Sequence, residues 1–310
     1  MKIRLFSCLL LLSLCLSSCS FVSGYSEPED RYIVAAMGFD MIEGFLEVSV
    51  QIVGRDEILI RTGRGENARA AMSHIVGADG RQLEISHCAL IIVGDGVVGS
   101  SLSDVFDYCR KNNDITVGVK VAAAYNAREI LSLGVDGYEL LGAVRDGIGG
   151  VGFAQGSRFY EIDEVRSEGG VYHLPYFETD GDIYTVSGLR LLDEGGVNVK
   201  LDRSESAYYM MIKGELKGGS MDVEYGGKKE SVYLGGSKTE YRSEGDRTYV
   251  SCSLKVNGEL LFADKKKVEE AITQEASRFF EELCSRYGDV FGFGEDKTVV
   301  IKCRLKEEKR

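Results

Sequence analysis

Apolar and polar residues follow two different periods along this chain, and the change of period separates strands from helices. Residues 33–37 form an apolar run, and Phe45 to Val53 alternate with a period of two, which is typical of strands. Asp40 to Gly44 lies between these runs and has the composition of a turn, so we expect a β-hairpin. Ala68 to Val76 then carries apolar residues at helical spacing, and Gly77 is expected to end that helix.

The next segments continue an alternation of strand and helix. They are predicted as a buried strand from Ser86 to Val93, a helix from Leu102 to Cys109, a strand from Ile115 to Ala124 and a short helix from Ala127 to Leu133. Ser101 and Asp104 have the spacing of a capping pair at the start of the second helix. Residues 31–140 are therefore predicted to form an N-terminal α/β domain with a mixed sheet.

A short glycine-rich middle region, residues 141–185, is expected after this domain. Gly147, Gly149 and Gly152 satisfy the spacing GxGxxG of dinucleotide sites. Such a site requires a buried strand before the motif and a helix opening after it, and neither pattern is present. We therefore interpret this segment as a flexible connection or an irregular subdomain, and we predict no cofactor.

The pattern from residue 186 to residue 310 is rich in strands. Gly-Gly pairs at 195–196, 218–219, 226–227 and 235–236 are typical of tight turns between antiparallel strands. One long amphipathic helix, Val268 to Tyr287, is followed by Gly288 as a stop. The predicted strands are Ile183 to Leu192, Val197 to Leu201, Ala207 to Lys213, Met221 to Tyr225, Ser231 to Leu234, Arg247 to Val256 and Thr298 to Leu305. The predicted fold class is α+β and multi-domain, with a C-terminal antiparallel sheet packed on one long helix.

The first nineteen residues have the pattern of an export signal. Lys2 and Arg4 precede an apolar run, residues 5–16, which is too short to cross a hydrocarbon core that needs about 20 residues. Cys19 directly follows Leu-Ser-Ser, an order that resembles the bacterial lipobox. This resemblance implies removal of residues 1–18 and a diacylglyceryl thioether on Cys19, with residues 19–30 as a tether. An ordinary secretory signal with an incidental cysteine is the alternative.

The charge balance excludes one class of partner. The chain has 37 basic and 49 acidic residues, a net charge of −12. An acidic protein repels phosphate backbones, so nucleic-acid binding is not expected. The same net charge gives no general attraction to an anionic membrane, so the lipid on Cys19 has to anchor the chain.

Residues with catalytic potential are few and scattered. The three histidines are His74, His87 and His173, and neither HExxH nor GxSxG occurs. His87 at the start of a buried strand is expected to need a hydrogen-bond partner. Five cysteines remain beyond Cys19, and their wide spacing fits neither a disulfide framework nor a zinc site: Cys88, Cys109, Cys252, Cys284 and Cys303. We therefore predict no metal site and no enzymatic activity.

Several segments in a fixed order resemble a known family. They include Asp30 to Asp40, Leu46 to Val53, Ser86 to Gly94 and Ala127 to Leu131. After the long helix comes a turn that begins at Tyr287 and runs Gly-Asp-Val-Phe-Gly-Phe-Gly to Glu295. Behind a lipobox, this order resembles the C subunits of spore germinant receptors, the Ger(x)C lipoproteins. The chain is similar to a short and divergent member, because Glu295 is followed almost at once by the last strand.

The resemblance implies a lipid-anchored, non-enzymatic protein on the outer face of the spore inner membrane. It implies assembly with two integral membrane subunits and a role in germination triggered by small nutrients. Gly292, Phe293 and Gly294 are expected to form a structural turn, because glycine permits positive φ and phenylalanine can fix the turn to the core. Two alternatives stay open: a solute-binding or envelope-scaffold lipoprotein unrelated to germination, and an envelope enzyme with a cleft around His87 or His173.

Overall fold

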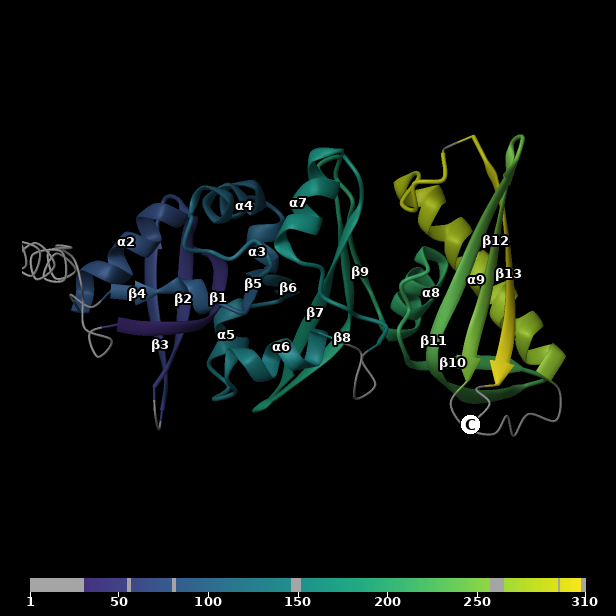
Figure 1. The fold of residues 1–310 in the computed structure, drawn as a ribbon, viewed down its shortest axis with the longest axis horizontal. Helices are drawn as coiled ribbons and strands as arrows, with labels where there is room; N and C mark the ends of the chain where they lie inside the picture. The colour runs from purple at the N-terminus through teal and green to yellow at the C-terminus, as the bar shows by residue number, and fades with distance from the viewer. Residues whose placement is uncertain are drawn as a thin grey trace, which may run out of the picture.

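Two β-sheets lie one after the other along an elongated molecule (Figure 1). This computed structural model describes residues 31–54, 57–79, 82–145, 152–256, 265–294 and 296–307. The predicted signal, Cys19 and the tether lie outside the described residues, as do Gly147, Gly149 and Glu295. None of the helices within the described part of the chain is long and apolar enough to cross a membrane.

The first sheet has nine strands and a mixed arrangement. Its order is β3-β2-β1-β5-β6-β7-β8-β9, with β4 pairing at one end of β1. Antiparallel pairs flank a parallel centre in which β1, β5, β6 and β7 run in the same direction. The strands are β1 (Arg31–Ile42), β2 (Phe45–Val53), β3 (Ile58–Gly65), β4 (Gln82–Glu84), β5 (Leu90–Gly94), β6 (Lys120–Ala124), β7 (Tyr172–Asp180), β8 (Ile183–Leu192) and β9 (Asn198–Leu201).

Helices cover both faces of this sheet, so its central strands are buried on both sides. One face packs against α2 (Ala68–Asp79), α4 (Leu102–Lys111) and α7 (Phe159–Ser167). The opposite face packs against α5 (Ala127–Leu131) and α6 (Gly137–Arg145). Two single-turn helices, η3 (Ile85–His87) and α3 (Asp95–Val98), flank β5. The mixed α/β arrangement predicted for this part of the chain is present.

The first sheet continues beyond the predicted end of the N-terminal domain. Strands β7, β8 and β9 join it, although Ile183 to Leu192 and Val197 to Leu201 are expected from the sequence among the strands of the second sheet. The middle region contributes α7 and β7 to this layer, and α6 extends into residues expected to be a flexible connection. The tertiary structure decides which strands pair over such distances, and the local pattern of apolar residues does not specify it.

The second sheet has four strands in the order β10-β11-β12-β13. Two of its three pairs of neighbours are antiparallel, but β13 pairs with β12 in parallel. The long helix α9 (Lys265–Tyr287) connects β12 to β13 as a crossover, and a crossover of this length permits parallel pairing. The strands are β10 (Gly219–Tyr225), β11 (Lys228–Glu244), β12 (Arg247–Val256) and β13 (Thr298–Glu307).

Residues 207–213 form a helix, so the strand predicted there is wrong. They belong to α8 (Arg203–Lys213), which begins at a capping box in which Asp202 accepts from the Glu205 N–H at 2.9 Å. Gly214 ends the helix in the left-handed region, at φ 75°. The run Ala-Tyr-Tyr-Met-Met-Ile is apolar at every position, and such a run has no period that separates strand from helix.

Three smaller expectations also differ from the structure. Gly235 and Gly236 do not turn the chain but lie within β11, where a bulge places Gly236 at φ 129°. Helix α2 continues past Gly77 to Asp79. Ser101 makes no side-chain cap, and Asp104 instead accepts a hydrogen bond from the Ala68 N–H at the start of α2. A side chain with capping chemistry can serve a helix that is distant in sequence.

Helix α8 stands where the two sheets meet. Its residues from Ser206 to Ile212 are all buried. Those from Ala207 to Ile212 belong to one apolar cluster that reaches from Leu90 and Ile92 of the first sheet to Val250 and Leu254 of the second. A second cluster fills the opposite face of the first sheet, beneath α2, α4 and α7. The two sheets therefore share part of one core.

Candidate functional site

The carboxylate of Asp40, in the first segment of the family resemblance, caps helix α5. Its oxygens accept hydrogen bonds from the N–H groups of Ala127 at 2.8 Å and Arg128 at 2.9 Å. Burial raises the pKa of Asp40, and the two N–H donors oppose that rise. A Cβ on Gly94 would lie 2.1 Å from the Asp40 Oδ1, so the neighbouring strand has room only for glycine at this position. Three segments of the resemblance thus meet at one capping contact.

Polar residues of β2 continue this contact along the same face. Glu47 is buried and accepts from Arg64 Nε at 2.7 Å and from Arg128 Nη1 at 3.3 Å. Gln51 donates through Nε2 to the carbonyl oxygens of Leu131 and Val135, at 3.0 and 2.9 Å. The first of these carbonyl groups lies at the end of α5, where a helix cannot satisfy its own acceptors. Glu47 and Gln51 of β2 therefore fasten α5 to the sheet.

The turn after α9 is built by one carboxylate and a group of aromatic rings. Gly292 and Gly294 have φ of 77° and 101°, and Asp289 accepts from the Phe293 N–H at 2.9 Å. The Phe291 and Phe293 rings stack with centroids 5.9 Å apart, and the Phe291 ring lies 5.3 Å from the Tyr209 ring of α8. This geometry fixes the end of α9 to the junction between the sheets.

The histidines differ in their surroundings. His74 and His87 are exposed, and His87 lies in η3, ahead of β5 and not within a buried strand. His173 of β7 is buried and lines a cavity of about 400 Å³, into which charged residues also project: Lys120, Glu161, Lys213 and Glu215. Burial lowers the pKa of His173, against an opposing effect of Glu215, whose Oε2 lies 3.9 Å from Nε2. Burial of His173 therefore favours the neutral imidazole over the charged one.

Most thiols of the described residues are poorly suited to nucleophilic chemistry. Burial raises the pKa of Cys88 to about 12 and that of Cys284 to about 11, and it also raises the pKa of Cys109. A thiol with such a pKa carries little thiolate at neutral pH. Across the described ranges, no group of three or more His, Cys, Asp or Glu residues could hold a metal ion.

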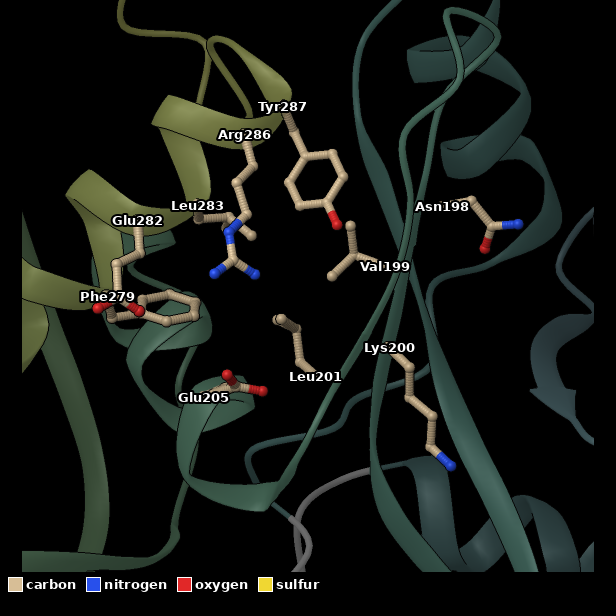
Figure 2. Close-up of a pocket in the computed structure, with 10 residues that line it drawn as sticks. All are labelled: Asn198, Val199, Lys200, Leu201, Glu205, Phe279, Glu282, Leu283, Arg286 and Tyr287. Atoms are coloured by element: carbon tan, nitrogen blue, oxygen red, sulfur yellow. The ribbon is translucent and has the colours of Figure 1, made fainter.

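A groove separates the edge of the first sheet from α9 (Figure 2). Its volume is about 270 Å³. Leu201 of β9 faces Phe279 and Leu283 of α9, while Glu282 and Arg286 are exposed at its margin. Because β9 is the last strand in the sheet order, no described strand pairs with its outer edge.

Lys200 of β9 turns away from this groove (Figure 2). Its ammonium group pairs with Glu178 and lies 4.2 Å from the centre of the Tyr176 ring. The charge of Lys200 is therefore used on the first sheet, while Glu205 and Arg286 line the groove beside its apolar side chains.

Several of these contacts could not be predicted from the sequence. The cavity around His173 joins residues from β6, α7, β7 and the end of α8, which no local motif connects. The groove joins residues of β9 and α9 that are distant along the chain. The weak signals that existed were polar residues at buried positions of β2, namely Glu47, Ser49 and Gln51.

The chain is similar to proteins of spore germination in both halves. The family model described as spore germination protein N-terminal domain matches residues 24–144. The family model described as spore germination B3/GerAC like, C-terminal, matches residues 187–299. Among solved structures, the crystal structure of the GerBC protein is similar with a TM-score of 0.51 and 11% identity, over 87% of this chain and 96% of that chain. No curated protein matches the chain.

Proposed function

The chain belongs to the GerAC-like family of spore germination proteins, and we propose that it acts as the lipid-anchored, non-enzymatic subunit of a nutrient germinant receptor. In this proposal, a diacylglyceryl group on Cys19 holds the protein on the extracytoplasmic face of the spore inner membrane. There it assembles with two integral membrane subunits and supports germination. The proposal does not require the protein itself to contact the small-molecule nutrient.

The observation that carries this proposal is the order of three features along one chain. A segment with the pattern of an export signal, followed by Cys19, precedes the match to the N-terminal family model, and the match to the C-terminal family model follows. Two or three acyl chains, at about 0.8 kcal/mol for each buried CH₂, bind a bilayer durably. The family membership weighs against a lipoprotein unrelated to germination.

The non-enzymatic part of the proposal is supported by the chemistry of the described residues. Burial raises the pKa of the Cys88 and Cys109 thiols, and His74 and His87 lie at the surface. The buried carboxylates closest to the segments of the resemblance, Asp40 and Glu47, are engaged by N–H groups and by arginines. These two carboxylates therefore stabilise the fold.

The test compares spores that carry the wild-type chain with spores that carry Cys19→Ala or lack the gene. We expect palmitate labelling and membrane fractionation of the wild type, and loss of both in Cys19→Ala. We also expect deletion and Cys19→Ala to slow germination with at least one amino acid or sugar.

A Cys15→Ala variant is the matched control and should behave as wild type. Equal labelling of Cys19→Ala would overturn the anchor. Normal germination of the deletion strain across nutrients, with other receptor genes removed, would overturn the role.

A further inference from the structure

The second sheet has one face without a helix, and basic residues outnumber acidic ones on the part of it formed by β11, β12 and β13. Helices α8 and α9 pack on the other face, where Val250, Leu254, Ile301 and Leu305 are buried. Side chains alternate between the faces of a strand, so the neighbours of these residues point outward. The outward positions of β12, of β13 and of β11 after its bulge carry seven basic and two acidic residues, a net charge of +5. They are Lys238, Glu240, Arg242, Glu244, Arg247, Lys255, Lys302, Arg304 and Lys306, all exposed.

Five of these seven cations form no ion pair with a described neighbour, although Arg247 is the register partner of Glu244 and the charge of Lys306 helps to lower the pKa of Glu240. Lys238 pairs with Glu240 at 2.7 Å, and Arg242 pairs with Glu244. Within the described residues, no ion pair engages the other five: Arg247, Lys255, Lys302, Arg304 and Lys306. Lys255 and Lys306 are register partners on adjacent strands. Cations side by side repel one another, so this arrangement gains nothing for the isolated fold.

The charge of this face opposes that of the molecule. The whole chain has a net charge of −12, so a face of +5 leaves −17 on the remainder. An anionic surface repels the remainder and attracts this face. We propose that this outer face of β11, β12 and β13, here named the basic face, binds the phosphate headgroups of an anionic bilayer.

The layout of the basic face favours a bilayer over an acidic peptide. Its cations stand on three adjacent strands, which lie about 4.8 Å apart, so they cover an area. On β13 they occupy consecutive outward positions about 6.7 Å apart, namely Lys302, Arg304 and Lys306. A peptide follows one line, whereas a bilayer presents anionic groups over a surface. Tyr249 and the exposed Val300 are register partners within the face, and tyrosine is enriched at the level of lipid headgroups.

The basic face also lies at the opposite end of the molecule from β1, which follows the segment bearing Cys19 (Figure 1). A lipid on the segment that precedes β1, together with the basic face, would attach the protein at two points and orient the second sheet against the membrane. The second attachment is then intramolecular and gains from a high effective concentration. This orientation rests on the proposed lipid anchor, but the binding of the basic face does not require it.

The experiment measures vesicle binding without acylation. The chain from residue 19 onward, with Cys19→Ser, keeps every described residue and is mixed with vesicles of phosphatidylcholine alone or with an equal part of phosphatidylglycerol. We expect cosedimentation with the anionic vesicles at low salt, weakened by screening at high salt. The triple variant Lys302→Gln, Arg304→Gln, Lys306→Gln should weaken binding to those vesicles by at least roughly tenfold.

The matched control removes the same number of positive charges from another part of the surface. Arg69→Gln, Lys111→Gln and Lys217→Gln neutralise three exposed cations outside the basic face and should leave vesicle binding within about twofold of the parent chain. Urea unfolding of both triple variants checks that the fold is retained.

Equal binding to neutral and anionic vesicles, or equal losses in the two triple variants, would overturn the proposal. Displacement from vesicles by soluble polyglutamate at matched charge would overturn it in favour of an acidic peptide. Because Cys19 is replaced, neither result depends on the lipid anchor.

Discussion

Single residues in this protein hold elements together that are distant in sequence. Asp40, near the end of a strand, accepts hydrogen bonds from the first two N–H groups of α5, and Gly94 leaves the space that its carboxylate occupies. Glu47 and Gln51 act in the same way from β2. Asp40, Glu47 and Gln51, which interrupt the apolar pattern of the first hairpin, therefore have structural partners across the fold.

Asp40→Ala should lower the free energy of unfolding by about 2–3 kcal/mol, because it leaves two N–H groups at a buried helix start without an acceptor. Asp40→Asn keeps one acceptor and should cost about 1 kcal/mol. Asp136→Ala is the matched control, since Asp136 accepts from the Glu139 N–H at an exposed site of α6, at 2.8 Å. Urea unfolding measures all three, and equal losses at Asp40 and Asp136 would contradict the role given to burial.

His173 should make stability depend on pH. Its pKa is lowered in the folded protein, so the unfolded chain takes up a proton first as the pH falls. The unfolded state then binds more protons, and stability decreases below the unfolded pKa of about 6.5, by at most about 1.4 kcal/mol for each pH unit. Below the folded pKa this loss stops growing.

The check is urea unfolding of the wild type and of His173→Gln at about pH 7 and about pH 5. Glutamine keeps a polar side chain but takes up no proton, so the difference in stability between the two proteins should change with pH. Glu215, Glu161 and Lys213 also affect this imidazole and are present in both proteins. A difference that stays constant over this range would contradict the prediction.

Helices and strands could be predicted where apolar residues recur with one clear period along the sequence. The strands Ile183 to Leu192 and Arg247 to Val256 match β8 and β12, and the long helix is followed by Gly288 with φ of 75°. The strand predicted at residues 207–213 was wrong because α8 is apolar at every position from Ala207 to Ile212, so its sequence has no period that separates strand from helix. The turn predicted at Gly235 and Gly236 was wrong because glycine occurs in bulges as well as in turns. End signals were present for α8, because Asp202 with Glu205 caps its start and Gly214 its end.

Helix α8 is expected to depend on its capping box. Asp202→Ala removes the acceptor for the Glu205 N–H and should cost about 1 kcal/mol of the free energy of unfolding. Glu205→Gln is the matched change, because glutamine at the third helical position can still accept from the Asp202 N–H. Urea unfolding should separate the two variants, and an unchanged Asp202→Ala would show that tertiary packing alone holds this helix.

At the scale of the whole molecule, α8 and one continuous apolar cluster connect the two sheets. Phe291 of the turn after α9 contacts Tyr209 of α8, whose ring itself lies 5.9 Å from the His173 ring of the first sheet. The junction is therefore packed with side chains from both parts. Because the two sheets share this core, unfolding one sheet would expose apolar surface on the other to water, which is unfavourable.

We expect one cooperative unfolding transition for the two sheets. Differential scanning calorimetry should show a single peak whose calorimetric and van't Hoff enthalpies agree. Met211→Ala, in the buried part of α8, should shift the whole peak to lower temperature, as Leu- or Met-to-Ala changes cost about 2–5 kcal/mol in cores. Two separated peaks in the wild type would contradict the continuous core.

The amino-acid sequence by itself determined the local features of this protein. The pattern of an export signal, the first hairpin, the long helix and the order of the family segments are all readable from neighbouring residues. Tertiary structure decided the pairing of β7, β8 and β9 with the first sheet, the parallel β12–β13 pair and the partners of Asp40 and His173. It also gathered the alternating cations of β11, β12 and β13 on one face. Local periods record which side of an element is buried, whereas strand neighbours and distant caps depend on chain closure over many residues, which no local pattern specifies.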